Sequence, residues 1–260
     1  MQRTSIISPL YTRCVGEDFN QVITARRAII ELRALGKPGR VQALQHFYKT
    51  APGGYGEGDV FLGLSVPQTR SIAKAYRAME LSEIEKLSAS KFHEVRLCGL
   101  IILTNQLKAN KEVKKRREFF NFYVKQLKLG RVNNWDLVDV SAPTIGEYLL
   151  EIEDPLPTLI KLARSSSLWE RRSAILFTFP FIRAGHFAPT LEISELLLRD
   201  KHDLIHKASG WMLRELGKRD LTLLRSFLSE HVVEMPRTML RYSIEKLPET
   251  ERQNWLKKSM

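Results

Sequence analysis

The stretch Arg171-Arg172-Ser173-Ala174 indicates the fold, because three other stretches share its order: a basic residue, any residue, a small residue, and a small or apolar residue. The other three are Arg96-Leu97-Cys98-Gly99, Lys207-Ala208-Ser209-Gly210 and Arg241-Tyr242-Ser243-Ile244. Their third positions lie 75, 36 and 34 residues apart, and the midpoint of the longest gap falls at 135–136. A period of about 36 residues is typical of stacked helix pairs. We therefore predict an all-α protein, a HEAT-like repeat α-solenoid of antiparallel helix pairs.

The repeat also predicts a binding surface. The small residue of each unit should let one helix pack closely on the next, and the basic residue should recur on one side of the stack. Because solenoids curve and use their inner side as an extended binding surface, we expect a basic concave face. We expect an N-terminal arm at residues 1–17, which contains Pro9 and Gly16, and a single HEAT-like α-solenoid domain at residues 18–260.

The charge balance suggests the kind of partner. The 260 residues include 41 Lys and Arg against 29 Asp and Glu, which gives a net charge of +12 and a pI near 9.8. Such an excess favours a polyanion, either nucleic acid or an anionic membrane surface. No apolar run approaches the roughly 18 residues of a transmembrane helix, no signal peptide is evident, and Cys14 and Cys98 suggest no disulfide framework. We expect a soluble, cytoplasmic monomer that does not associate with membranes.

Several familiar sites are not indicated. The glycine-rich stretch 51–59 lacks the Gly-Lys-Ser/Thr of a phosphate-binding loop and follows no strand, so we interpret it as a tight loop carrying an exposed Tyr55. His202 and His206 have metal-ligand spacing, but no third ligand is near in sequence. Cys98 lies in an apolar helical pattern without a local base. We therefore expect no metal, no cofactor and no thiol nucleophile.

The stretch Asn133-Asn134-Trp135-Asp136-Leu137-Val138-Asp139-Val140 carries the strongest chemical signal. On a helix, Trp135 and Asp139 share one face because they are four residues apart. They could be a core residue and a local salt bridge, or the wall of a site that offers an indole and a carboxylate together. Asp136 is a rival carboxylate, but it lies about 100° around the helix from Trp135 and could cap the helix or pair with Arg131.

Three ordered motifs resemble the HEAT-repeat alkylpurine DNA glycosylases of the AlkD family, which are DNA alkylation repair enzymes. They are Trp-Asp-x-Val-Asp at 135–139, Trp-x-x-Arg-x-Ala-Ile-Leu-Phe at 169–177, and Lys-Ala-x-Gly-Trp-x-Leu-Arg-Glu at 207–215. The resemblance covers roughly residues 40–250 and is strongest over 131–217. The stretch 235–246 departs from the best-known members.

The resemblance implies a site on the concave face. Trp135 and Trp211 would flank a cleft with Asp139 between them as the catalytic carboxylate, and Arg172 would contact DNA phosphate beside the lesion. Tyr55 would match a DNA-contacting tyrosine of the family, although the length of chain that follows it differs. The lesion would stay outside any deep pocket. The residues expected to bind DNA, including basic residues near the repeat motifs, are Arg172, Tyr55, Lys207, Arg214 and Arg241.

The chemistry of such a site is consistent with these residue types. An N3- or N7-alkylated purine is cationic and leaves without a general acid, so the requirement is to stabilise an oxocarbenium-like sugar and position water. A carboxylate does both, and indole faces add cation–π stabilisation. The expected function is a DNA repair glycosylase that hydrolyses the N-glycosidic bond of these purines in double-stranded DNA. The alternatives are a non-catalytic HEAT-like module that binds damaged or branched DNA, and a protein–protein scaffold.

Overall fold

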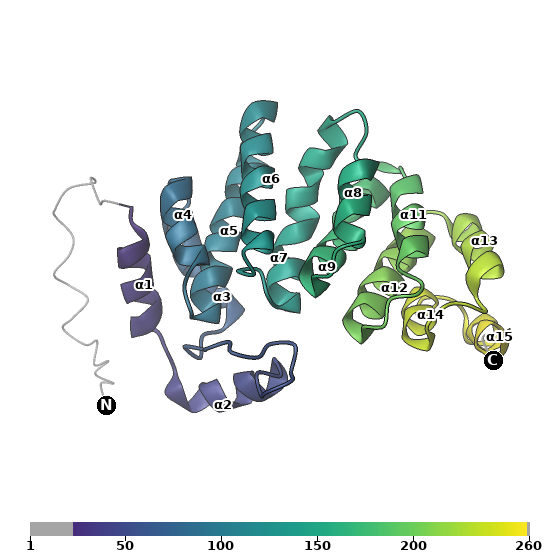
Figure 1. Ribbon diagram of the computed structural model, residues 1–260, viewed down its shortest axis with the longest axis horizontal. Coiled ribbons are helices and arrows are strands. Elements are labelled where there is room, and N and C mark those ends of the chain that lie inside the picture. Colours follow the sequence, from purple (N-terminus) through teal and green to yellow (C-terminus); the bar gives the residue numbers. More distant parts are fainter. Residues whose placement is uncertain (1–22, 259–260) are drawn as a thin grey trace, which may run out of the picture.

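The computed structural model describes residues 23–258, so the predicted arm at 1–17 lies outside the described residues. Figure 1 shows the described helices side by side in a curved row, with α2 lying across on the inner side of the curve. The helices are α1 (Ala25–Ala34), α2 (Pro38–Phe47), α3 (Val66–Ala75), α4 (Leu81–Ser88), α5 (His93–Ala109), α6 (Val113–Lys128), α7 (Trp135–Ile145), the 3-10 helix η2 (Gly146–Glu151), α8 (Leu156–Ala163), α9 (Leu168–Leu176), α10 (Phe179–Ala184), α11 (Ala188–Leu196), α12 (Asp203–Gly217), α13 (Leu221–His231), α14 (Arg237–Ser243) and α15 (Glu249–Lys258).

Two layers of helices make up the stack. Helices α5, α7, α9, α12 and α14 pack against one another in that order, and α4, α6, α8, α11 and α13 pack against them as a second layer. Between residues 23 and 258 the chain forms no β-strand, only an isolated bridge between Val60 and Phe92. The prediction of an all-α, HEAT-like α-solenoid is confirmed.

All four repeat stretches lie on the first of these layers, in α5, α9, α12 and α14. The midpoint of the long gap, at 135–136, is the start of α7. The predicted repeat is therefore confirmed, and it includes one unit whose residues diverge from the shared pattern. In that unit the Trp135 stretch replaces the shared pattern.

Small residues allow these helices to approach closely. The third positions of the four stretches are at most 1% exposed: Cys98, Ser173, Ser209 and Ser243. The adjacent Gly210 shows the reason, because a Cβ there would lie 2.5 Å from the Met239 carbonyl oxygen and from Cβ of Tyr242. Burial raises the pKa of the Cys98 thiol to about 12, which fits the prediction of a small buried residue.

The basic residues of the repeat are mostly held by the protein itself. Arg96 is buried and bonds to Asp59, Arg171 bonds to Asp200 at 2.6 Å, and Lys207 bonds to Asp203 at 2.6 Å. Arg241 is exposed, and within residues 23–258 it forms no ion pair. The first positions of the repeat therefore tie separate segments together at two places, Arg96 and Arg171, while Lys207 pairs within its own helix. Over the same residues, no helix is long and apolar enough to cross a membrane.

Candidate functional site

A carboxylate and a guanidinium from successive helices form the centre of the site. The Arg172 side chain of α9 donates from Nε to Oδ1 of Asp139 and from Nη2 to Oδ2, both at 2.8 Å, so the pair is bidentate. Arg172 also donates from Nη1 to the carbonyl oxygen of Leu204, which joins α7, α9 and α12 in their N-terminal halves. Three of its five N–H groups are thus engaged within the described chain. This geometry explains why Arg172 is 4% exposed without being an uncompensated charge.

Asp139 is partly open to solvent, with 21% of its side chain exposed. Burial raises the pKa of its carboxyl, the Arg172 guanidinium opposes that rise, and the nearby Asp136 charge adds to it, so that the pKa lies above its ordinary value. Asp139 does form a salt bridge, as one of the two interpretations expected. Its partner is 33 residues away rather than local.

Trp135 belongs to an aromatic cluster at the N-terminus of α7. Its ring stacks on Tyr48, with 5.6 Å between centroids, and meets the edge of Phe47 at 5.7 Å. The backbone N–H of Trp135 is capped by the Asn134 side chain at 2.9 Å. Because Trp135 is only half-buried, part of the indole remains available beside the Asp139 helix.

Trp211 lies further along the stack, in α12. It is half-buried and packs against Phe179 of α10, with 6.1 Å between ring centroids. It is seven residues beyond Leu204, so it lies two turns along the same face of α12. The two indoles therefore have different neighbours, and each keeps part of its surface exposed.

Asp136 has a structural partner that the sequence did not suggest. Its Oδ2 accepts from the Tyr48 hydroxyl at 3.2 Å and lies 2.8 Å from Nε2 of His93. It neither caps α7 nor pairs with Arg131, which bonds to Glu85 and Gln126 instead. The expectation for its partner was wrong because Tyr48 and His93 come from distant parts of the chain.

His93 bridges two carboxylates in the interior. Its Nδ1 lies 3.0 Å from Asp59 and its Nε2 2.8 Å from Asp136. A neutral imidazole has one N–H, so donating to both carboxylates requires the imidazolium. Burial favours the neutral ring, but the bonds to Asp136 and Asp59 outweigh burial and raise the pKa of His93 to about 9.

Asp59 completes this network at the end of the glycine-rich loop. It also accepts from Arg96 and from Asn133, the latter at 2.9 Å. Burial disfavours its charge, but the bond from His93 and the Arg96 charge hold the pKa of the carboxyl below its usual value. With His93 and Arg96 protonated, two positive groups balance Asp59 and Asp136. The network fastens the loop to α5 and to the start of α7.

The glycine-rich stretch is a tight loop, as predicted, but Tyr55 is half-buried rather than exposed. The Tyr55 hydroxyl donates to the Phe47 carbonyl oxygen at 3.4 Å, and its ring meets Trp169 of α9 edge-on at 6.3 Å. A Cβ at Gly56 would lie 2.3 Å from the Tyr48 carbonyl oxygen. The glycines thus allow the loop to lie against α2 while Tyr55 reaches α9.

The other residues expected to bind DNA differ in how strongly the protein holds them. Lys207 pairs with Asp203 on its own helix. Arg214 pairs with Glu245 and with Glu215. Arg241, on α14, is exposed and unpaired within the described part of the chain. Of these three cations, Arg241 is the one most available to a partner.

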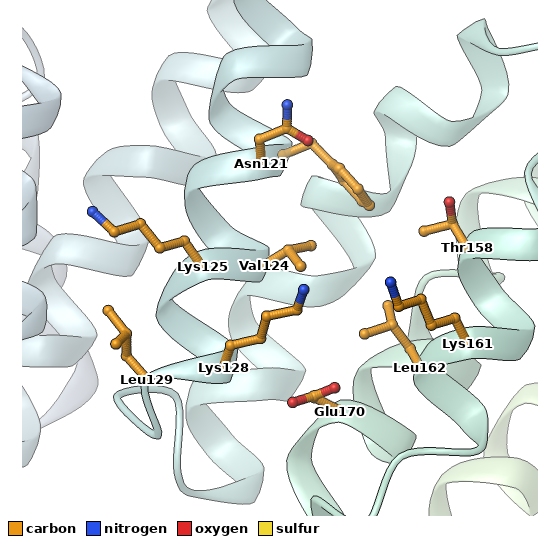
Figure 2. A pocket seen from close by; sticks show the side chains of 10 residues that line it. Asn121, Val124, Lys125, Lys128, Leu129, Thr158, Lys161, Leu162 and Glu170 are labelled. Carbon is orange, nitrogen blue, oxygen red and sulfur yellow. The ribbon is translucent and has the colours of Figure 1, made fainter.

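A separate pocket of about 560 Å³ lies between α6 and α8. Figure 2 shows Lys125, Lys128 and Lys161 among the residues that line it, together with the apolar Val124, Leu129 and Leu162. Glu170 of α9 borders it, two residues before Arg172. Residues two apart point to different sides of a helix, so this pocket does not open onto the Asp139–Arg172 pair.

Sequence reasoning did not identify Tyr48, Asp59 or His93. Asp59 and His93 are 34 residues apart, and Tyr48 is 88 residues from Asp136. One signal was present, since Asp59 ends a glycine-rich stretch that had no assigned purpose. Glycines let a loop lie close to other segments of the backbone, so the carboxylate of Asp59 was a candidate for long-range hydrogen bonds.

The fold and this geometry define a class: helical-repeat proteins with a partly exposed carboxylate–arginine pair, the carboxylate standing four residues after a half-buried tryptophan on the same helix. Residues 28–247 match the sequence profile of a protein family described as "DNA alkylation repair enzyme". The chain belongs to this family, which supports a role in DNA repair.

A solved structure gives the same architecture. The predicted DNA alkylation repair enzyme from Enterococcus faecalis superposes with a TM-score of 0.65, over 82% of this chain and 97% of its own. The two sequences are 16% identical, so this likeness concerns the fold. Comparison with curated protein sequences returns no match.

Proposed function

We propose that the protein is a DNA glycosylase that hydrolyses the N-glycosidic bond of cationic N3- or N7-alkylated purines in duplex DNA. The observation that carries this proposal is the Asp139 carboxylate, which is partly exposed, held by two bonds from Arg172, and next to the Trp135 turn of α7. Membership of a DNA alkylation repair family supports the same class of reaction.

Asp139 acts on the sugar rather than on the base. A purine that already carries a positive charge departs as a neutral base, so no group has to protonate it. The developing charge is on the sugar, where a fixed carboxylate in a partly desolvated site stabilises it. The same carboxylate orients the water that attacks C1′ and accepts its proton as the bond forms. Trp135 and Trp211 add cation–π stabilisation through their exposed faces.

Arg172 couples DNA binding to this charge. Its guanidinium is bidentate to Asp139 and donates a third bond to Leu204, which leaves two N–H groups. Only 5% of the side chain is exposed, so the proposed phosphate contact requires the backbone of the DNA to reach the inner face at this point. A phosphate that engages these groups weakens the hold of Arg172 on Asp139, so the carboxylate interacts more strongly with the cationic sugar. Tyr55, Lys207, Arg214 and Arg241 complete the proposed DNA contacts.

The direct test is release of 7-methylguanine and 3-methyladenine from methylated duplex DNA. We expect the wild-type protein to release them, and Asp139→Asn to reduce the rate by about 100-fold or more while DNA affinity is kept. Asp154→Asn makes the same chemical change at an exposed residue before α8 and should have no effect. Equal rates for Asp139→Asn and the wild type would remove Asp139 from the mechanism.

A second function also has an observation in its favour. Both oxygens of Asp139 already accept bonds from Arg172, as in an ion pair that only joins two helices. A non-catalytic module that binds damaged or branched DNA would have that geometry. Tight binding to such DNA with no release of methylated bases by the wild-type protein would favour this second function.

A further inference from the structure

Helix α2 is an ordered helix that buries none of its residues. Figure 1 shows it lying across the direction of the other helices, on the inner side of the curved row. A helix normally gains its stability by burying one face. In α2 the apolar Val41 and Leu44 are only half-buried, so its position depends mainly on its two ends.

Both ends of α2 are fixed to the rest of the protein. Before the helix, the Lys37 N–H donates to the Leu62 carbonyl oxygen at 2.9 Å. After it, Tyr48 is buried and stacks on Phe61 at 5.1 Å between centroids, while its hydroxyl donates to Asp136. Lys49 then turns the chain with a φ of 51°, a left-handed value that non-glycine residues seldom adopt. The orientation of α2 is therefore fixed at both of its ends.

Phe47, the last residue of α2, points out of the protein. Its side chain is 58% exposed although its neighbour Tyr48 is almost fully buried. It lies 5.0 Å from the Tyr48 ring and 5.7 Å from Trp135, measured between centroids. Single exposed apolar residues are common and need no explanation. Phe47 differs because it extends the Trp135 cluster outward and its backbone is held by Tyr48 and Tyr55.

The charge around Phe47 suits a polyanion. The stretch 37–50 contains Lys37, Arg40 and Lys49, all exposed, and no acidic residue. At a rise of 1.5 Å per residue, α2 is about 15 Å long, roughly four base-pair steps of duplex DNA at 3.4 Å each. Lys37 and Arg40 precede Phe47 in the sequence and Lys49 follows it. This order of charges is complementary to duplex DNA, which has phosphates on each side of its stacked bases.

We propose that Phe47 is a wedge that enters duplex DNA from the minor groove at the base step beside the lesion, while Lys37, Arg40 and Lys49 hold the flanking phosphates. This inference rests on the proposed function only for its partner, duplex DNA. Apolar side chains that insert between base steps unstack them and kink the duplex. Because α2 is fixed at both ends, the wedge is ordered before DNA arrives, and little side-chain freedom is lost on binding.

The wedge deepens the proposed reaction in one respect. A carboxylate on the inner face of a rigid solenoid reaches the deoxyribose only if the backbone comes toward it. Kinking the duplex at Phe47 brings the sugar of the lesion nucleotide toward Trp135 and Asp139. The base itself does not have to enter a pocket.

The test uses full-length protein and a duplex that holds an abasic-site analogue with 2-aminopurine as the adjacent base. Unstacking of 2-aminopurine raises its fluorescence, and no base can be released from the analogue. We expect the wild-type protein to raise the fluorescence. Phe47→Ala should abolish the rise and weaken binding about tenfold, the scale of one lost aromatic–base contact, with the salt dependence unchanged. Phe47→Trp should keep the rise.

Ile30→Ala is the matched control, because Ile30 on α1 is also 58% exposed. It should behave as the wild type, and thermal unfolding should confirm that all variants fold. Release of 7-methylguanine, measured in parallel, tests the glycosylase separately. Unstacking by the wild type that depends on Phe47 supports the wedge even where no base is released. No unstacking by the wild type, or equal unstacking by Phe47→Ala, overturns the wedge whatever the release assay gives.

Discussion

Asp139 and His93 show opposite uses of a buried charge. Asp139 is ionised at a cost, since burial raises the pKa of its carboxyl even with Arg172 bonded to it. His93 is protonated with a gain, because two carboxylates flank its ring. The first arrangement leaves a carboxylate that still interacts favourably with new positive charge. The second fixes the position of the segments it joins, and His93 therefore acts on the site only through Asp136 and the start of α7.

The pH dependence of stability should report His93. Its pKa rises from an ordinary 6.5 to about 9 on folding, so the folded state holds this proton more tightly than the unfolded state. The stabilisation is complete below about pH 6.5 and is lost as pH rises through about 9. We expect the free energy of unfolding in urea to fall between these values, by on the order of 3 kcal/mol.

His93→Gln keeps one donor and removes the titration. Its unfolding free energy should be lower than that of the wild type at pH 6 and should be flatter between pH 6.5 and 9. Tyr48, Asp59, Arg96 and Asp136 are the charged or titratable groups that face His93. A wild-type profile with no fall in this window would mean that His93 is not held as the imidazolium.

At the scale of elements, the glycine-rich loop organises the first half of the molecule. It carries Asp59 to His93, Tyr55 to Trp169, and Gly56 to the backbone of Tyr48. A Cβ on Gly56 would also lie 3.0 Å from Nδ2 of Asn134, whose side chain caps α7. The loop thus determines where α7 begins and how Trp135 is presented.

Two glycine substitutions separate this role from general flexibility. Gly56→Ala should lower the unfolding free energy by about 1–3 kcal/mol, because the new methyl group has no room beside the Tyr48 carbonyl oxygen. Trp135 emission should change with it. Gly39→Ala, in α2, meets nothing within 4 Å and should be neutral or stabilising by up to about 1 kcal/mol. Thermal unfolding of the pair decides, and equal effects would contradict the close approach of the loop.

Much of the architecture could be predicted from the sequence, because it depends on local patterns. The period of about 36 residues located the helices of one layer, including the divergent unit at Trp135, and the small residues at the third positions are buried as expected. The sequence also singled out Asp139 and Arg172, which the structure brings together. Tyr48, Asp59 and His93 could not be predicted, since their contacts span 34 to 88 residues and no helical periodicity encodes them.

At the scale of the whole molecule, only part of the net charge of +12 is free to interact with a partner. Many cations are paired with carboxylates, including Arg96, Arg171, Lys207 and Arg214. Pairing leaves fewer cations to displace counterions from DNA than the composition suggests. The salt dependence of binding should therefore reflect the unpaired cations, not the total charge.

Arg241 offers a measurement of this effect. Replacing it by alanine should weaken DNA binding and reduce the slope of log K against log salt by about 0.9, the contribution of one phosphate contact. Arg199→Ala removes a cation that is 89% exposed and pairs with Glu234 near α11, and it should leave the slope unchanged. Fluorescence anisotropy from 50 to 200 mM salt is sufficient. Equal slopes for Arg241→Ala and the wild type would place Arg241 away from the phosphates.

The glycine-rich loop also affects the order in which the protein unfolds. In an ordinary solenoid each unit touches only its neighbours, so it can fray from either end. Here the loop after α2 reaches α5 through Asp59 and α9 through Tyr55, and so links units that are not adjacent in the chain. Unfolding from the N-terminal side requires all of these links to break together. In contrast, α13 and α14 are joined to the stack mainly through α12, and α15 bonds to Arg225 of α13 and Arg237 of α14. Amide hydrogens should therefore exchange first at the C-terminal end, with the half that carries Trp135 and Asp139 opening last and as one cooperative block.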